Sequence, residues 1–231
     1  MGLIGFAGSS LRLDLDTLRW KAEELNESSQ RKYLGGTSYA ARLLYDEQRG
    51  GIDPLSPEAM IVLATGPLTR NSIPGGGSIE LCFKSPLTGG WGESRAGSDF
   101  GPDLRRSGFD HLVIRGRAKE PTWLVIHDGQ VEFRSASPMV GMTVSAKHKY
   151  MRGELPAGKW SLCCIGKGGE NLVKFANVMF DDRAAGRGGA GAVFGSKNLL
   201  AIAVRGSVEP GAAEPERLTA LLREAFSALG K

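Results

Sequence analysis

The sequence predicts an α+β protein with two largely antiparallel β-sheets and a few helices. Strand-like segments outnumber helical ones by roughly two to one, and most connections are too short for the crossover helices of a parallel sheet. A clear hairpin occupies residues 122–136, with Asp128-Gly129 at its tip. The length of 231 residues and the hydrophobic content of 41% suffice for a sizeable core.

Hydrophobic periodicity places the elements along the chain. Alternating apolar and polar residues at 10–16 predict a half-buried strand. Apolar residues at helical spacing predict two helices, at 39–49 and 144–155. Apolar runs bounded by glycine or proline predict further strands at 59–69, 78–89, 111–118, both arms of the hairpin, 160–166, 173–180 and 198–206.

The last part of the chain differs in composition. Residues 208–215 form a linker rich in proline, glycine and alanine, and residues 214–230 have the pattern of an amphipathic helix. We therefore expect a domain at residues 1–207, followed at 208–231 by a linker and a helix.

Composition excludes several classes of protein. The net charge is only +4 and the basic residues are dispersed, which disfavours a nucleic-acid surface. No apolar run reaches the ~18 to 20 residues of a membrane-spanning helix, and the amino terminus is a poor signal peptide. Three cysteines, Cys82, Cys163 and Cys164, do not make an even disulfide framework. We expect a cytoplasmic protein that binds neither nucleic acid nor membranes.

One segment combines arginine with an unusual density of glycine. It reads "DRAAGRGGAGAVFGSKN" and contains the letters of a dinucleotide fingerprint, but the following strand begins too soon for a crossover helix. Its glycines can let backbone amides converge on an anion, with Arg183 and Arg187 adding hydrogen bonds to a phosphate. Alternatively, the glycines serve only close packing between strands, and the arginines lie in solvent.

The chain resembles the N-terminal domain of the aldehyde:ferredoxin oxidoreductase family, the tungsten-pterin enzymes, over about residues 11–206. Each matching stretch is weakly specific alone, but their order and spacing are highly specific. They are "KYLGG", "DPLSPE", "ATGPLT", "KSPLTGG", "GSDFGPDLRRSGFDHLVIRGRAKEP", "GENLVKFANVM" and the glycine-arginine segment.

The resemblance implies a two-sheet domain that carries tungsten, or molybdenum, chelated by two pterins whose phosphates are bridged by magnesium. It implies that Arg183 contacts a pterin, that the backbone carbonyl of Ala184 faces the magnesium ion, and that the backbone of Gly97 lies against the cofactor. A supporting role follows for the other residues of the motif, which are Gly186, Arg187, Gly188 and Gly189.

Two positions depart from the family pattern. Ser78 stands where an arginine directed at a pterin is usual, and Arg95 stands where an asparagine contributes to the magnesium site. An arginine side chain has only donors and cannot coordinate magnesium. Arg95 can instead pair with a phosphate or restore the charge lost at Ser78; equally, the two changes can signify altered cofactor affinity or a different substrate.

The resemblance also places the iron–sulfur cluster and the acid–base residues in later domains. Three cysteines cannot supply the four thiolates of a 4Fe-4S cluster, so we assign no catalytic residue to this chain and expect it to be inactive alone. The implied partners are C-terminal domains or a separate subunit with the cluster cysteines, ferredoxin as electron acceptor, and a second copy in a homodimer.

Two functions follow from these considerations. The first is the cofactor-binding part of a tungsten-pterin enzyme that oxidises an aldehyde to a carboxylate and passes electrons to ferredoxin. The second is a non-catalytic cofactor-binding or scaffold module that retains the fold without activity.

Overall fold

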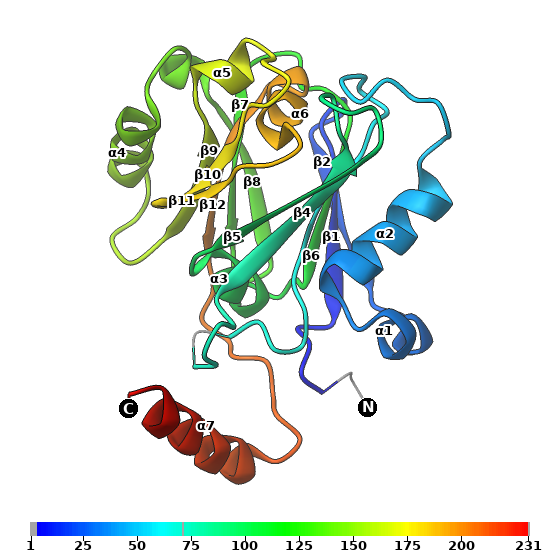
Figure 1. Cartoon of the computed structure of the whole chain (residues 1–231). Helices are drawn as coiled ribbons and strands as arrows, with labels where there is room; N and C mark the ends of the chain where they lie inside the picture. The colour runs from blue at the N-terminus through cyan, green and yellow to red at the C-terminus, as the bar shows by residue number, and fades with distance from the viewer. Residues whose placement is uncertain (1–3, 71, 231) are drawn as a thin grey trace.

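Two six-stranded β-sheets packed against each other form the body of the protein (Figure 1). The structure is a computed structural model and describes residues 4–70 and 72–230. The first sheet has the order β2 (Arg19–Glu24), β1 (Ser9–Asp14), β6 (His111–Arg115), β3 (Ile61–Ala64), β4 (Ser78–Lys84), β5 (Trp91–Gly97). The second has the order β11 (Arg183–Ala185), β10 (Val178–Phe180), β9 (Ser161–Ile165), β12 (Leu199–Arg205), β7 (Thr122–His127), β8 (Gln130–Ser135).

The described helices other than α7 lie beside the two sheets (Figure 1). In chain order, the helices are α1 (Glu27–Tyr33), α2 (Gly36–Glu47), α3 (Phe100–Arg106), a 3₁₀ turn at Ser137–Met139, α4 (Val144–Glu154), α5 (Lys167–Glu170), α6 (Ala190–Ser196) and α7 (Pro215–Leu229). Side-chain caps begin two of them: Asn26 accepts from the Ser29 amide at α1, and Thr143 accepts from the Ala146 amide at α4. None of the helices in the described ranges combines the length and apolar character needed to span a membrane.

The main core lies between the inner faces of the two sheets. A smaller core lies on the other side of the first sheet, where Ala40, Leu43 and Leu44 of α2 pack on β3, β4 and β6. Strand β4, which lies between β3 and β5, is therefore buried along most of its length, whereas β5 at the sheet edge alternates between exposed and buried residues. This difference leaves one face of β5 open to solvent.

The structure confirms the predicted fold class and most of the predicted elements. Pairings between the described strands are antiparallel except β1 with β6 and β12 with β7. The expected strand at 173–180 is wrong in its first half, because residues 173–177 form turns, with the Val173 carbonyl accepting from the Ala176 amide. Sequence reasoning missed β2, β5, β11, α1, α3, α5 and α6. The seven-residue helix α6 occupies the stretch that we judged from the sequence to be too short for a crossover helix.

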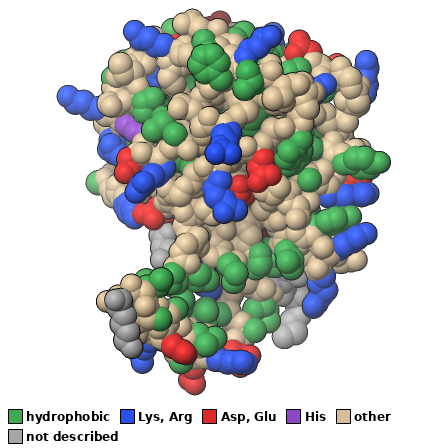
Figure 2. All heavy atoms as spheres, viewed as in Figure 1, with side chains coloured by type: hydrophobic (Ala, Val, Ile, Leu, Met, Phe, Trp, Pro, Cys, Tyr) green, Lys and Arg blue, Asp and Glu red, His purple; other side chains and the backbone are tan. Residues whose placement is uncertain are grey.

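The segment after β12 is held against the body before α7 begins. The Gly5 amide donates to the Gly211 carbonyl at 3.1 Å, and Glu209 pairs with Arg70 and Arg106. No described residue of α7 is buried, and Figure 1 shows the helix standing away from the sheets. Figure 2 shows hydrophobic side chains on α7 and on the underside of the body above it.

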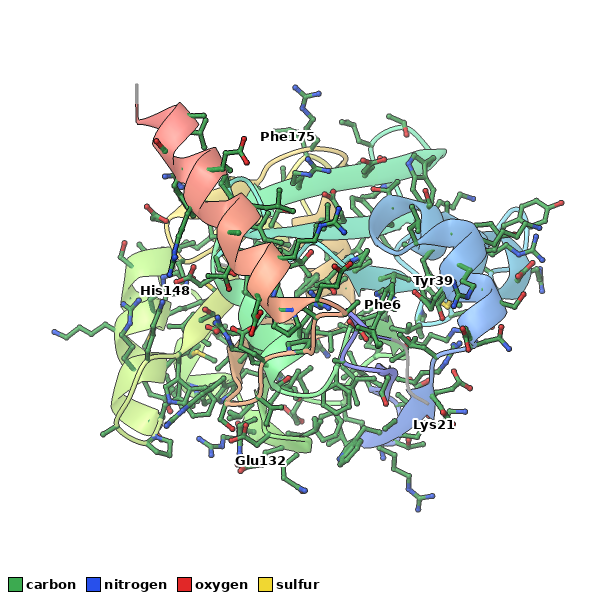
Figure 3. All side chains as sticks on the ribbon, turned by 90° about the horizontal axis from the view of Figure 1, so that it is seen from below. Phe6, Lys21, Tyr39, Glu132, His148 and Phe175 are labelled. Carbon is green, nitrogen blue, oxygen red and sulfur yellow. The ribbon has the colours of Figure 1, made fainter. Side chains whose placement is uncertain are left out.

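A buried histidine makes the fold sensitive to acid. His111 on β6 has no exposed surface and stacks on Tyr39 of α2 with ring centroids 4.4 Å apart; Figure 3 labels Tyr39 on that helix. Burial lowers the pKa of His111 from 6.5 to about 3, and the Arg105 charge adds to the effect.

Because the unfolded chain binds this proton below pH 6.5 and the folded chain does not, the stability that the neutral ring contributes is present above pH 6.5. We expect the free energy of unfolding to fall by about 1.4 kcal/mol per pH unit from this residue as pH drops toward 3. Urea unfolding of wild-type and His111→Leu protein at several pH values checks this. An unchanged slope in the variant would contradict it.

Candidate functional site

The two sheets bring their edge strands together at β5 and β11. These strands are the last members of their sheets and lie side by side, although about 90 residues separate them in the chain (Figure 1). On β5 the exposed residues are Trp91, Glu93, Arg95 and Gly97. On β11 the side chains of Arg183 and Ala184 are exposed. Figure 2 shows basic side chains with acidic ones between them on the face that carries these strands.

The N–H and C=O groups of Ala184 point sideways from the edge of the second sheet, away from β10. Phe180 and Arg183 flank the two-residue turn between β10 and β11, and the Asp181 amide is directed to β9, where it donates to the Leu162 carbonyl at 2.8 Å. Because bonded and non-bonded pairs alternate in an antiparallel ladder, the N–H and C=O of Ala184 are directed away from β10. They face the side on which β5 lies.

On β5 the backbone N–H and C=O groups of alternate residues point away from β4, because bonded and non-bonded pairs alternate in this antiparallel ladder too. The Ser85 amide donates to the Gly90 carbonyl at 2.9 Å, and the Ser98 amide donates to the Gly77 carbonyl at 3.1 Å. These two bonds set the phase of the β4–β5 ladder, so the residues paired with β4 without hydrogen bonds include Arg95 and Gly97. The backbone N–H and C=O groups of Arg95 and Gly97 therefore point sideways from the edge of the first sheet, away from β4.

The glycine-arginine segment after β11 is fastened to the first sheet. The Arg187 amide donates to Ser94 Oγ at 3.0 Å, and the Gly188 carbonyl accepts from Ser85 Oγ at 2.7 Å. Among residues 4–70 and 72–230, no carboxylate forms an ion pair with Arg187. The segment thus crosses from one sheet to the other and presents an exposed guanidinium beside the edge strands.

Glycines in this segment have different surroundings. Gly189 has φ +88°, and a Cβ there would lie 2.0 Å from the Lys174 carbonyl oxygen, so close packing requires glycine. At Gly186 a Cβ would meet no described atom within 4 Å. The backbone at Gly186 is therefore open to an approaching group, whereas Gly189 packs tightly against the backbone of Lys174.

Two pockets lie on either side of the edge of β5. One of about 720 Å³ is lined by Gly97 and Arg183 together with residues before β9, including Lys159 and Trp160. The other, about 280 Å³, contains Ser78 and Arg95 and is closed by the start of α2 and residues 64–69. The two hollows contain four of the predicted site residues, Gly97 and Arg183 in one and Ser78 and Arg95 in the other. Ala184 and residues 186–189 line neither hollow, and Gly189 is buried.

Sequence reasoning missed Glu80, which pairs with Arg95 across β4 and β5. The Glu80 side chain is only 7% exposed, and its Oε2 atom has no hydrogen-bond partner among the described residues. Burial raises the pKa of Glu80, although Arg95 acts in the opposite direction. The sequence feature that could have identified Glu80 is an acidic residue inside the apolar run "SIELCF".

The three cysteines are core residues. Cys82 lies on β4, and Cys163 and Cys164 lie on β9 in the other sheet; all are free and buried. Burial raises the pKa of the Cys82 and Cys164 thiols to about 12. In the described part of the chain, no three His, Cys, Asp or Glu side chains group to hold a metal ion.

Fold and site together define a two-sheet domain whose adjoining edges expose arginine side chains and unpaired backbone oxygens. Residues 10–206 match the family model described as the aldehyde ferredoxin oxidoreductase N-terminal domain. The chain belongs to the aldehyde ferredoxin oxidoreductase family.

Comparison with individual proteins agrees with this assignment. The chain is 42% identical over 228 residues to the tungsten-containing aldehyde ferredoxin oxidoreductase of Pyrococcus furiosus, which covers 98% of this chain and 38% of that protein. It is 35% identical over 244 residues to the aliphatic sulfonate oxidoreductase, WOR-like subunit, of the same organism, covering 98% and 39%.

A solved structure has the same fold. It is the active site complex BamBC of benzoyl coenzyme A reductase in complex with 1,5 dienoyl-CoA. The TM-score is 0.94 at 30% identity, and the match covers 97% of this chain and 34% of that one. The chain thus spans somewhat more than a third of the length of these relatives.

Proposed function

We propose that this chain is the N-terminal domain or subunit of a tungsten-pterin oxidoreductase and binds the phosphates of a bis-pterin cofactor. The reaction proposed for the whole enzyme is ferredoxin-linked oxidation of an aldehyde to a carboxylate. The observation that carries the proposal is the meeting of two strand edges, which brings Arg183, Ala184 and Arg187 next to Arg95 and Gly97.

The donor set fits the phosphates. Arg183 is 67% exposed, and among the described residues its one ion pair is with Asp182, which is 84% exposed, at 3.7 Å. Guanidinium groups bind phosphate oxygens in two-pronged hydrogen bonds. Arg183 and Arg187 would therefore hold the phosphates, and the open backbone at Gly186 and Gly97 would allow a close approach.

The site also fits a magnesium ion, despite the departure at Arg95. Magnesium takes oxygen ligands and usually keeps several waters. The carbonyl oxygens of Ala184 and Arg95 are both directed out of their sheets, and neither depends on the identity of the side chain. An arginine at position 95 therefore removes a side-chain ligand but leaves a main-chain one.

When bound, the tungsten or molybdenum cofactor would supply the two-electron redox chemistry. The residues of this chain would bind and orient it through the phosphates. The remaining domains, or a separate subunit, would contribute the 4Fe-4S cluster, the acid–base residues and the contact with ferredoxin. They would also cover the apolar side chains of α7, of which Phe226 is 53% exposed.

Cofactor content tests this proposal. The enzyme that contains this chain is purified without oxygen, and tungsten, molybdenum and magnesium are measured together with pterin fluorescence after oxidation. Replacing Arg183 by alanine removes charge-assisted hydrogen bonds and is expected to lower the affinity for the cofactor by about tenfold or more. Arg31→Ala is the matched control and is expected to retain full content, because Arg31 lies on α1 and its side chain is 76% exposed, against 67% for Arg183.

The pairing of Arg95 with Glu80 favours a second candidate, a cofactor-binding or scaffold module without activity. A carboxylate that already neutralises Arg95 reduces the positive charge available to a phosphate. Stoichiometric pterin without aldehyde-dependent reduction of ferredoxin would support this candidate. Absence of both metal and pterin from the wild-type enzyme would contradict both functions.

A further inference from the structure

Strand β8 leaves one edge of the second sheet without a neighbouring strand. Among the described strands it pairs only with β7. The width of the six-stranded sheet, about 24 Å, separates it from β11 and the candidate functional site. Figure 3 labels Glu132, a residue of β8, near the margin of the molecule. An unpaired edge of this kind can accept a strand from another chain.

The free backbone groups of β8 belong to alternate residues. The Ala136 amide donates to the Pro121 carbonyl at 2.7 Å, and this bond sets the phase of the β7–β8 ladder. Because bonded and non-bonded pairs alternate, the N–H and C=O groups of Val131, Phe133 and Ser135 point away from β7. In the described part of the chain, these groups have no backbone partner.

The two faces of β8 differ in chemistry. The side chains of Val131 and Phe133 are partly buried and pack against the main core. Glu132 and Arg134 alternate with them and therefore lie on the opposite face, where Arg134 Nη2 bonds Glu132 Oε2 at 2.6 Å. The side chains of this ion pair are 46% and 30% exposed, so both charges are accessible to a second strand.

The register determines which side chains of two antiparallel β8 strands would meet. In the central register, Phe133 lies opposite Phe133 of the second copy, and Glu132 lies opposite Arg134. A shift of two residues in one direction places Glu132 opposite Glu132, and a shift in the other direction places Arg134 opposite Arg134. Like charges directly opposite each other are destabilising. Of these three registers, only the central one has complementary charges.

We propose that β8 binds β8 of a second copy of this chain, antiparallel and in the central register. The second sheets of the two copies then form one continuous sheet across a two-fold axis. Each Glu132 contacts Arg134 of its own chain and Arg134 of the second copy, and the two Phe133 side chains cover each other at the axis. This inference goes beyond the proposed function, because it concerns an edge that binds no cofactor.

The free edge of the first sheet at β2 is less suited to such pairing. The Leu25 amide donates to the Gly8 carbonyl at 3.0 Å, so the residues with outward backbone groups are Trp20, Ala22 and Glu24. In the corresponding register, Ala22 would lie opposite Ala22, and Trp20 would lie opposite the carboxylate of Glu24. The β2 edge therefore has a small residue at its centre, whereas the β8 edge has an aromatic one.

Sedimentation velocity of the 231-residue chain tests the inference. A single strand pair buries less area than a standard interface, so we expect a weak monomer–dimer equilibrium, measured over about 1 to 200 µM. Glu132→Arg places arginine opposite arginine twice across the axis and is expected to raise the dissociation constant by at least about tenfold. Glu132→Arg combined with Arg134→Glu exchanges the charges and is expected to return the constant to within about threefold of wild type.

A matched reversal on β2 separates the two edges. Lys21 is 67% exposed and lies on β2, where the corresponding register would place it opposite Glu23, and Lys21→Glu is expected to leave the dissociation constant unchanged. Association through the apolar side chains of α7 would not respond to the charges on β8. A wild-type chain that is monomeric over the whole range, or a dissociation constant that Glu132→Arg does not change, would overturn the proposal.

A backbone variant tests the same edge without changing a charge. It is needed because Arg134 lies over the Trp123 ring at 5.4 Å, so that the exchange of charges can also lower stability. Ser135→Pro removes an outward N–H that donates only in the dimer, and is expected to raise the dissociation constant by about tenfold. Ser135→Ala retains that N–H and the wild-type constant. Equal constants for the proline and alanine variants would contradict pairing through β8.

Discussion

Replacing Gly189 by alanine is expected to lower the free energy of unfolding by about 4 kcal/mol, the sum of two effects. Gly189 has φ +88°, which strains any residue with a Cβ. The added carbon would also lie 2.0 Å from the Lys174 carbonyl oxygen and 3.0 Å from Pro86 Cγ, so the backbone at 174 must move. Denaturation in guanidinium chloride, followed by circular dichroism, measures the change.

Gly186→Ala is the matched control, three residues away in the same motif. Its Cβ meets no described atom within 4 Å, so the expected change is within about 0.5 kcal/mol, as at other open surface positions. Equal losses at 186 and 189 would show that the motif is destabilised by substitution in general, and would refute the role assigned to packing against residue 174.

The second large effect is expected at Asp110, which forms a fully buried ion pair with Arg105. The side chains are 0% and 1% exposed, and the carboxylate also accepts from the amides of Ala7 at 3.1 Å and Gly8 at 2.8 Å. Asp110→Ala leaves the Arg105 charge buried without a counter-charge, and is expected to cost about 3 to 5 kcal/mol of stability.

A surface pair provides the comparison. Glu27 and Arg31 form an exposed ion pair on α1, and Glu27→Ala is expected to cost less than about 1 kcal/mol. The double variant Arg105→Met, Asp110→Leu removes both charges and should recover part of the loss. If Asp110→Ala unfolds at the same denaturant concentration as Glu27→Ala, the buried pair does not stabilise the fold.

The same ion pair supports the smaller of the two pockets beside β5, the one that contains Ser78 and Arg95. Arg105 Nη1 donates to the carbonyl oxygens of Pro67 at 3.3 Å and Thr69 at 2.7 Å. Pro67 and Thr69 line the pocket opposite Glu80. Loss of Asp110 is therefore expected to loosen this wall as well as the amino-terminal segment.

Periodicity predicted the elements whose residues are buried in a regular pattern. The hairpin β7–β8 turns at Asp128 and Gly129, both with positive φ, as its sequence indicates. In contrast, β5 reads "WGESRAG", in which Gly92, Ser94 and Ala96 are the buried residues. Small side chains face the core there, so the strand carries no apolar alternation by which it could be recognised.

Less of the candidate site could be predicted from the sequence. Arg183 and Arg187 were visible in their motif, but their proximity to β5 arises from the packing of two sheets and leaves no trace in local spacing. Family resemblance supplied the roles of Gly97 and Ala184. The Glu80–Arg95 pair follows from strand register, which periodicity alone does not determine.

The adjoining edges of β5 and β11 have a consequence for solubility. An unpaired strand edge is a template for another strand, and such edges promote aggregation unless they are blocked. Here Arg95 and Arg183 oppose the addition of a strand from a neighbouring chain, because that strand would desolvate their charged side chains. The positive charge that we propose to hold a phosphate ligand would thus also protect the newly synthesised protein against intermolecular sheet formation.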